Sequence, residues 1–156
     1  MRNKILILGL LLGMGVAVFV DQRQRFETPA TSWLFPGLLE KLPSVTKLRL
    51  SEAGDGVDLV LDNGAWVVAQ RFNYPANDKQ LFQLLNQLGE ARLIEKKTAL
   101  SKHHAALGLL EGPRDSAPIL TLDGDPTLKP VLIGQQASAR QGTFVRFQSD
   151  DQVWLI

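Results

Sequence analysis

One stretch, residues 56–88, constrains the fold of this chain more than any other. It begins with two apolar runs, residues 57–62 and 65–70, on either side of the dipeptide Asn63-Gly64. This dipeptide readily takes the positive φ angles of a type I′ turn and is the strongest short-range signal for a β-hairpin. Apolar residues alternate with polar ones in the first run and occupy both faces in the second. We therefore expect a β-hairpin here.

A helix is expected directly after the hairpin. Tyr74-Pro75-Ala76 turns the chain, Asn77 is suited to cap the helix, and Gln80 completes a capping box. The apolar residues that follow have helical spacing: Leu81, Leu84, Leu85 and Leu88, with Phe82 widening the stripe. The hairpin and the helix present apolar surfaces that can pack together, which favours an α+β core.

Further strands and helices are expected before and after residues 56–88. A short helix is expected between Pro36 and Pro43, a strand over residues 44–52 and an extended segment over 93–97. Ser101 and Gly108 have the residue types that start and stop a second helix. Strands are then expected at residues 118–122, 128–133, 143–147 and 152–156. The predicted fold class is α+β, one domain of antiparallel β-meanders with about seven strands packed with two helices.

The first twenty residues have the pattern of a membrane-targeting segment. The basic head with Arg2 and Lys4 precedes an uninterrupted apolar run, residues 5–20. As a helix this run covers roughly 24 Å, which spans a bilayer with some thinning. A cleaved signal peptide is the rival interpretation, although the small-x-small motif Gly15-Val16-Ala17 lies inside the run. We expect a transmembrane helix that acts as a signal anchor.

Three regions follow from this interpretation: an anchor at residues 1–20, a polar stem at 21–32, and an extracytoplasmic α+β domain at 33–156. The basic head favours an N-terminus in the cytoplasm. The expected location is the bacterial inner membrane, with most of the chain in the periplasm. Trp33, Leu34 and Phe35 either lie at the bilayer interface or pack under the sheet.

Charge and cysteine content exclude several classes. The sequence has 17 basic and 16 acidic residues, and without Arg2 and Lys4 the basic residues fall to 15. The rest of the chain therefore has a net charge of −1, and no nucleic-acid partner is expected. The absence of cysteine excludes disulfides, thiolate metal sites and a cysteine nucleophile.

The candidate metal and nucleotide sites are weak. His103 and His104 are adjacent, so on a helix their side chains diverge, and we expect both to be solvated. Asp123-Gly124-Asp125 lacks the ligand ladder of a calcium loop and reads as a turn. The glycines at 134 and 142 do not form a phosphate-binding pattern. We expect no metal site and no cofactor.

No catalytic constellation is visible either, because no serine lies in a known nucleophile context. Trp66 and Tyr74 could stack on a sugar or a peptide. An aromatic residue in a hairpin above a helix is more often part of the core, and Tyr74 is the better surface candidate because it precedes a turn proline. The catalytic residues are therefore predicted to be none, and the ligand-binding residues stay unassigned.

The last residues, Val153-Trp154-Leu155-Ile156, form an apolar strand that only Asp150 and Asp151 guard. Such a strand is either paired on both sides within the sheet or is an edge that awaits a partner.

Several stretches together resemble a known family. In order, they read LFPGLLEKLPSVTKLRL, NGAWVV, YPAND, LGL, LIG, GTFVRF and VWLI. Over residues 34–156 they resemble domain of unknown function 4340, a bacterial envelope family with an N-terminal anchor. That family is related to auxiliary proteins of gliding-motility-type ABC transport systems and has no established catalytic residues. The positions carried over are structural: Trp66, Pro75, Asp78, Gly108 and Gly134.

Members of this family usually continue well past the strand at residues 153–156. The resemblance therefore implies a short paralogue, a truncated gene product or a fragment. The expected function is a non-enzymatic, membrane-anchored module that binds a transporter or envelope protein. The alternative is a domain that binds glycan, peptidoglycan or peptide.

Overall fold

The computed structural model describes residues 32–112, 116–138 and 141–156, all within the compact unit Thr31–Ile156. In the first half of this unit the elements are β1 (Ser32–Trp33), α2 (Leu38–Lys41), η1 (Leu42–Ser44), β2 (Lys47–Glu52), β3 (Asp55–Asp62), β4 (Ala65–Val68), η2 (Ala69–Arg71), β5 (Tyr74–Pro75) and α3 (Asp78–Glu90). In the second half they are β6 (Arg92–Leu93), β7 (Glu95–Lys96), η3 (Ser101–His103), η4 (Ala105–Leu107), β8 (Ile119–Asp123), β9 (Val131–Gln136), β10 (Thr143–Phe147) and β11 (Val153–Leu155).

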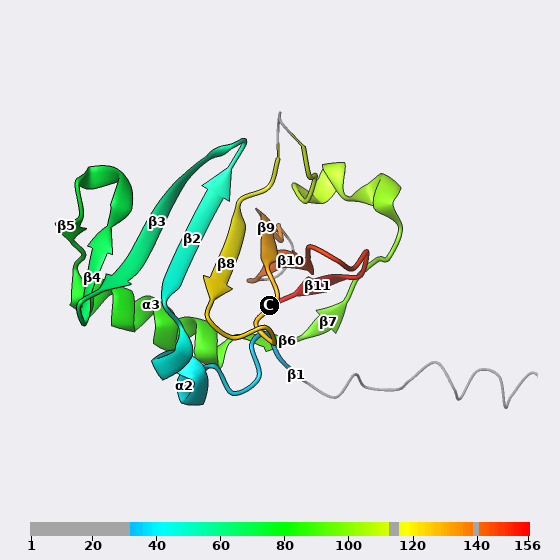
Figure 1. Ribbon diagram of the computed structural model, residues 1–156. Coiled ribbons are helices and arrows are strands. Elements are labelled where there is room, and N and C mark those ends of the chain that lie inside the picture. Colours follow the sequence, from blue (N-terminus) through cyan, green and yellow to red (C-terminus); the bar gives the residue numbers. More distant parts are fainter. Residues whose placement is uncertain (1–31, 113–115, 139–140) are drawn as a thin grey trace, which may run out of the picture. The chain divides into compact units, whose positions relative to one another are not determined.

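Nine of these strands form one sheet in the order β5-β4-β3-β2-β8-β9-β10-β11-β7, and β1 pairs with β6 separately. Every pairing is antiparallel. Figure 1 shows the two groups of strands, β2–β5 and β8–β11, joined where β2 lies beside β8. This confirms the mixed α+β class with antiparallel meanders. The two-fold pairing of β11, with β10 and β7, places the last strand inside the sheet.

The predicted hairpin and helix are confirmed in their local geometry. Asn63 and Gly64 have φ angles of 47° and 82°, as a type I′ turn requires, and Leu61 lies opposite Trp66 across the hairpin. At the start of α3 the side-chain Oδ1 of Asn77 accepts a hydrogen bond of 3.2 Å from the backbone N–H of Gln80.

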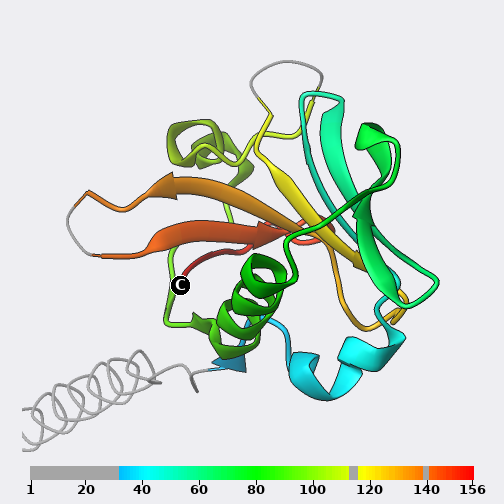
Figure 2. The ribbon, with the colours of Figure 1, turned by 90° about the vertical axis from the view of Figure 1, so that its left-hand side faces the viewer.

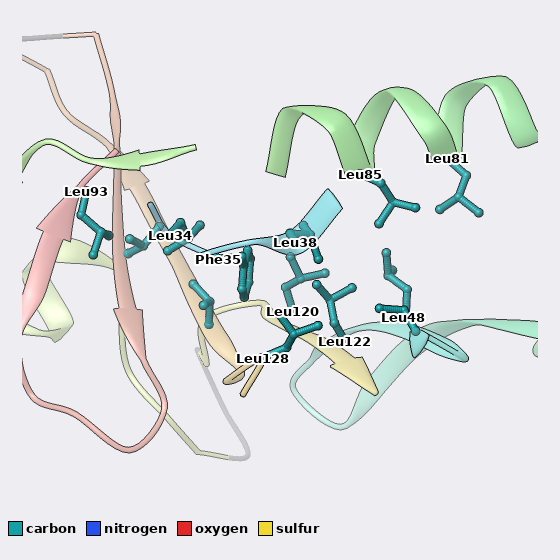
Figure 3. Packing of buried hydrophobic residues seen from close by; sticks show 13 residues of the cluster. Leu34, Phe35, Leu38, Leu48, Leu81, Leu85, Leu93, Leu120, Leu122 and Leu128 are labelled. Atoms are coloured by element: carbon teal, nitrogen blue, oxygen red, sulfur yellow. The ribbon is translucent and has the colours of Figure 1, made fainter. Parts of the chain in front are cut away.

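The main core lies between one face of the sheet and the two helices. Figure 3 shows Leu81 and Leu85 of α3 pointing toward Leu48 on β2 and Leu38 on α2. Figure 2 shows α3 lying across this face of the sheet. Leu34 and Phe35, each 2% exposed, belong to the same cluster, whereas Trp33 is 41% exposed. Of the two alternatives for this tripeptide, packing under the sheet is therefore confirmed for Leu34 and Phe35.

A smaller core covers the other face in the C-terminal half. Successive residues of β9 separate into the two clusters: Val131 belongs to the main core and Leu132 to the smaller one with Leu109 and Val153. Because side chains alternate across a strand, this part of the sheet is buried on both faces. The segment that carries η3 and η4 supplies the cover through Leu107 and Leu109.

Two predictions about the fold are wrong in detail. The described residues contain eleven strands rather than about seven, because β1, β5, β6 and β7 are short two-residue pairings that carry no pattern. The second helix, expected from Ser101 to Gly108, is instead two 3₁₀ turns, η3 and η4. The segment is too short to stabilise an α-helix, and Gly108 ends it at a φ of 67°.

The predicted anchor helix at residues 5–20 lies outside the described residues. Within the part of the chain that the structure describes, none of the helices has the length and apolarity needed to cross a bilayer.

Candidate partner-binding surface

The most exposed aromatic residues of the described chain lie where β4 passes into β5. We call Phe72, Asn73 and Tyr74 the aromatic turn. The side chain of Phe72 is fully exposed and that of Tyr74 is 70% exposed. β5 is also an edge of the nine-stranded sheet, so the aromatic turn borders open backbone. Large apolar side chains held in solvent at a sheet edge are typical of protein–protein contact sites.

The backbone of the aromatic turn is strained. Phe72 has φ 53° and ψ 41°, and Asn73 has φ 56°, so both residues adopt the left-handed conformation. Asparagine tolerates this region, but a bulky residue such as phenylalanine does so at a cost of order 1 kcal/mol or more. Strain of this kind persists only where the surrounding structure enforces it and is concentrated at functional sites.

Both ends of the aromatic turn are fixed to the sheet. On one side, Oε1 of Gln70 accepts a hydrogen bond of 2.9 Å from the N–H of Asp58 and holds η2 against β3. On the other side, the N–H of Ala76 donates to the carbonyl of Trp66 at 2.8 Å. The rigid ends make the presentation of Phe72 and Tyr74 reproducible, which lowers the entropy lost when a partner binds.

A second candidate is a cavity of about 480 Å³ near the other end of the sheet. Its polar lining comes from Glu95, Lys97, Gln135, Gln136 and Ser138. Lys97 Nζ and Glu95 Oε1 are 2.9 Å apart. We call this the polar cavity. Its volume falls in the range of small-molecule sites, and amide and charged groups are suited to polar ligands such as sugars or peptides.

The two histidines do not behave alike. His103 is exposed, as expected, but His104 is 4% exposed, so the prediction that it is solvated is wrong. Its Nε2 lies 3.1 Å from the carbonyl oxygen of Asp151, to which it donates. His104 lies at the junction of the two 3₁₀ turns η3 and η4 rather than inside an α-helix. His104 thereby ties the η3–η4 segment to the turn between β10 and β11.

Arg146 reinforces the same contact from the buried face of β10. Its guanidinium donates to the carbonyl of Asp150 at 3.0 Å and to that of Leu109 at 3.4 Å, and it forms a short ion pair with Glu111. A buried charge that is paired and hydrogen-bonded in this way fixes the position of a segment. Arg146 and His104 are therefore positioned to hold the cover of the smaller core in place.

The candidate calcium loop and Trp66, both named in the sequence analysis, are parts of the fold. Asp123 is the last residue of β8, and Gly124 and Asp125 follow in the connection to β9. Trp66 is half-buried against the main core. In the described parts of the chain, histidine and carboxylate side chains nowhere gather in a group of three or more that could hold a metal ion. The predictions of no metal, no cofactor and no catalytic residue remain predictions.

Gly108 and Gly134 both lie where η4 comes close to β9. A Cβ on Gly108 would lie 2.8 Å from Cγ of Gln135, and one on Gly134 would lie 2.5 Å from the carbonyl oxygen of Leu107. Glycine is thus required at both positions for the close approach of η4 to β9. Sequence reasoning did not identify Phe72, although the sequence Phe-Asn before Tyr-Pro carries a weak turn signal.

By its fold and its surface, the described part of the chain is an antiparallel α+β domain with an exposed aromatic turn and a polar cavity. The chain belongs to the family described as Domain of unknown function (DUF4340), whose sequence model matches residues 66–156. Comparison with curated proteins and with solved structures gives no match. The matched segment begins on β4 and ends after β11. It therefore excludes β2 and β3, with which β8 and β4 pair.

Proposed function

We propose that this chain is a non-enzymatic, membrane-anchored module of the bacterial envelope that binds another protein through the aromatic turn. The observation that carries the proposal is the full exposure of Phe72 on a strained, doubly fixed turn. Burying a phenylalanine side chain contributes about 1.5–3 kcal/mol to association. Together with Tyr74, it is large enough to serve as the anchor of an interface.

The proposed partner is a component of an ABC-transport or cell-envelope assembly. Two points support this choice. The apolar run at residues 5–20 would place the partner at the membrane. The family that the sequence resembles is, by that resemblance, related to auxiliary proteins of ABC transport systems. Protease treatment of spheroplasts tests the location. We expect residues 32–156 to be digested from outside while the chain stays membrane-bound. Release of a soluble mature form, or full protection of the domain, would contradict the anchor.

The variant Phe72→Asn separates binding from stability. Asparagine accepts the left-handed conformation, so we expect an unchanged or higher melting temperature. Loss of the phenyl ring should lower recovery of the crosslinked partner at least tenfold, because ~1.4 kcal/mol corresponds to tenfold in affinity.

Phe82→Asn is the matched control, since Phe82 is 52% exposed and belongs to α3 rather than to the aromatic turn. We expect this variant to keep its partner, apart from a small loss of helix stability. Both variants are assayed in the full chain, purified in mild detergent after crosslinking in cells. Equal recovery from the two variants would refute the aromatic turn as the contact site.

The polar cavity favours a second function, the binding of a glycan, peptidoglycan fragment or peptide. The carrying observation is the Glu95–Lys97 ion pair beside two glutamines in a cavity of about 480 Å³. Titration with muropeptides tests it through the fluorescence of Trp154, whose neighbour Leu155 lines the cavity. A saturable change that Gln135→Ala abolishes supports this function, and a flat titration rejects it.

A further inference from the structure

The corner of the domain at which the described chain begins carries an unusual combination of side chains. The extended segment from β6 to β7 alternates: Arg92, Ile94 and Lys96 are exposed, whereas Leu93 is buried. Ile94 is 54% exposed, although it is a large β-branched apolar residue. In both Figure 1 and Figure 2 this segment lies beside β1, the first described strand.

Each of the two cations in this segment stands over a tryptophan. The guanidinium carbon of Arg92 is 4.2 Å from the ring centroid of Trp33, and Nζ of Lys96 is 5.3 Å from that of Trp154. Among the ion pairs formed between described residues, a nearby one joins Lys97 to Glu95. None of these ion pairs contains Arg92 or Lys96. Their charges are therefore available to an external anion. We call Trp33, Arg92, Ile94, Lys96 and Trp154 the tryptophan corner.

We propose that the tryptophan corner rests on the surface of an anionic bilayer. Tryptophan is enriched at the membrane–water interface, where its ring lies among the headgroups. Arginine and lysine beside it bind lipid phosphates, and an exposed isoleucine can enter the acyl boundary. A protein partner would require a complementary acidic surface, but a bilayer supplies both the negative charge and the apolar layer at once.

The length of the chain before β1 supports this occupant, and at this point the inference rests on the proposed membrane anchor. Residues 21–31 separate the apolar run from β1 and extend to at most about 40 Å. A domain of about 125 residues has a radius of gyration of about 14 Å. The tether is thus long enough for contact at β1, and docking there would leave the aromatic turn, at the opposite edge of the sheet, free to bind a partner.

The absence of cysteine makes a direct test possible. Ile94→Cys in the full chain is labelled with the fluorophore NBD and reconstituted into phosphatidylcholine vesicles with or without phosphatidylglycerol, containing nitroxide-labelled lipid. Val57→Cys is the matched control, because Val57 is also β-branched and is 50% exposed, on β3. Both substitutions replace exposed side chains and leave the cores intact.

We expect strong quenching at position 94 and little at 57, with the difference largest in vesicles that contain phosphatidylglycerol. Each basic residue at an anionic surface strengthens binding about fivefold, so Arg92→Gln combined with Lys96→Gln should weaken docking by an order of magnitude or more. Salt at ~1 M, where the Debye length is about 3 Å, should act in the same direction.

Flotation of the vesicles separates the two ways to fail. If the chain floats with the vesicles but positions 94 and 57 are quenched equally, the tryptophan corner is not the docking surface and the anchor stands. If the chain does not float, the anchor and the inference are both overturned. Quenching at position 94 that the double glutamine variant leaves unchanged would overturn the role of the two cations.

Discussion

Removal of β11 should unfold the domain, because this strand holds two other strands in place. The N–H of Ile94 donates to the carbonyl of Leu155 at 2.8 Å, and the N–H of Lys97 donates to that of Val153 at 2.9 Å. On the opposite side β11 pairs with β10. Deletion of residues 153–156 therefore leaves β7 without a partner and exposes the flank of β10.

The magnitude follows from burial. Val153 and Leu155 are 0% and 2% exposed, and burying each contributes about 1.5–3 kcal/mol. The loss of roughly 3–6 kcal/mol, before any hydrogen bond is counted, is a large part of the ~5–15 kcal/mol that stabilises a small domain. We expect the deleted chain to unfold or aggregate.

A single substitution in β11 gives a loss of stability that can be measured without unfolding the domain. Leu155→Ala should cost about 2–5 kcal/mol, and a loss of ~3 kcal/mol lowers the melting temperature by roughly 10 °C. Leu50→Ala is the control, since Leu50 is 43% exposed in β2; we expect it to lose about 1 kcal/mol or less. Thermal denaturation followed by circular dichroism measures both. A deleted chain that stays monomeric with an unchanged melting temperature would refute the interior placement of β11.

Three further substitutions test local geometry. Gly64→Val should destabilise the domain by about 1 kcal/mol or more in urea denaturation, since a β-branched residue is strained at φ 82°; an unchanged midpoint would contradict the type I′ turn. Gly124→Ala alone should destabilise the domain more than Gly64→Val does, because the new Cβ would overlap the carbonyl of Ser44. Near-native stability of this variant would disprove the close approach. Hydrogen bonds from the side chain and backbone of Thr127 lower the pKa of Asp125. Thr127→Val should raise that pKa in an NMR titration. The contribution of Asp125 to stability is present above its unfolded-state pKa and is lost as the pH falls through the lowered folded-state pKa.

Local signals in the sequence predicted the parts of the fold that depend on neighbouring residues. Asn63-Gly64 specified the hairpin because few dipeptides accept two positive φ angles, and Asn77 specified the start of α3 through one side-chain hydrogen bond. The stretch at 101–108 carries the same kinds of signal, but its length cannot sustain a helix, so tertiary contacts determined its conformation.

The candidate surfaces depend on contacts that no local pattern reveals. Phe72 lies next to Asn73 in the sequence, but the turn that presents it is held by a hydrogen bond between Gln70 and Asp58 on β3, which no local pattern predicts. The burial of His104 depends on the carbonyl of Asp151, far along the chain. Tyr74 was identified because a proline follows it, which is a local property.

The pairing of β2 with β8 determines the order in which the chain can complete its sheet during synthesis. Lys47 lies opposite Asp123, and Ser51 lies opposite Ile119, so the partners are about 70 residues apart. At ~5–20 residues per second, β8 emerges roughly 4–14 s after β2. During that interval the hairpin of β2 and β3 presents the unpaired edge of β2. A nascent chain in that state is exposed to aggregation, and any factor that shields β2 until β8 arrives should raise the yield of folded protein.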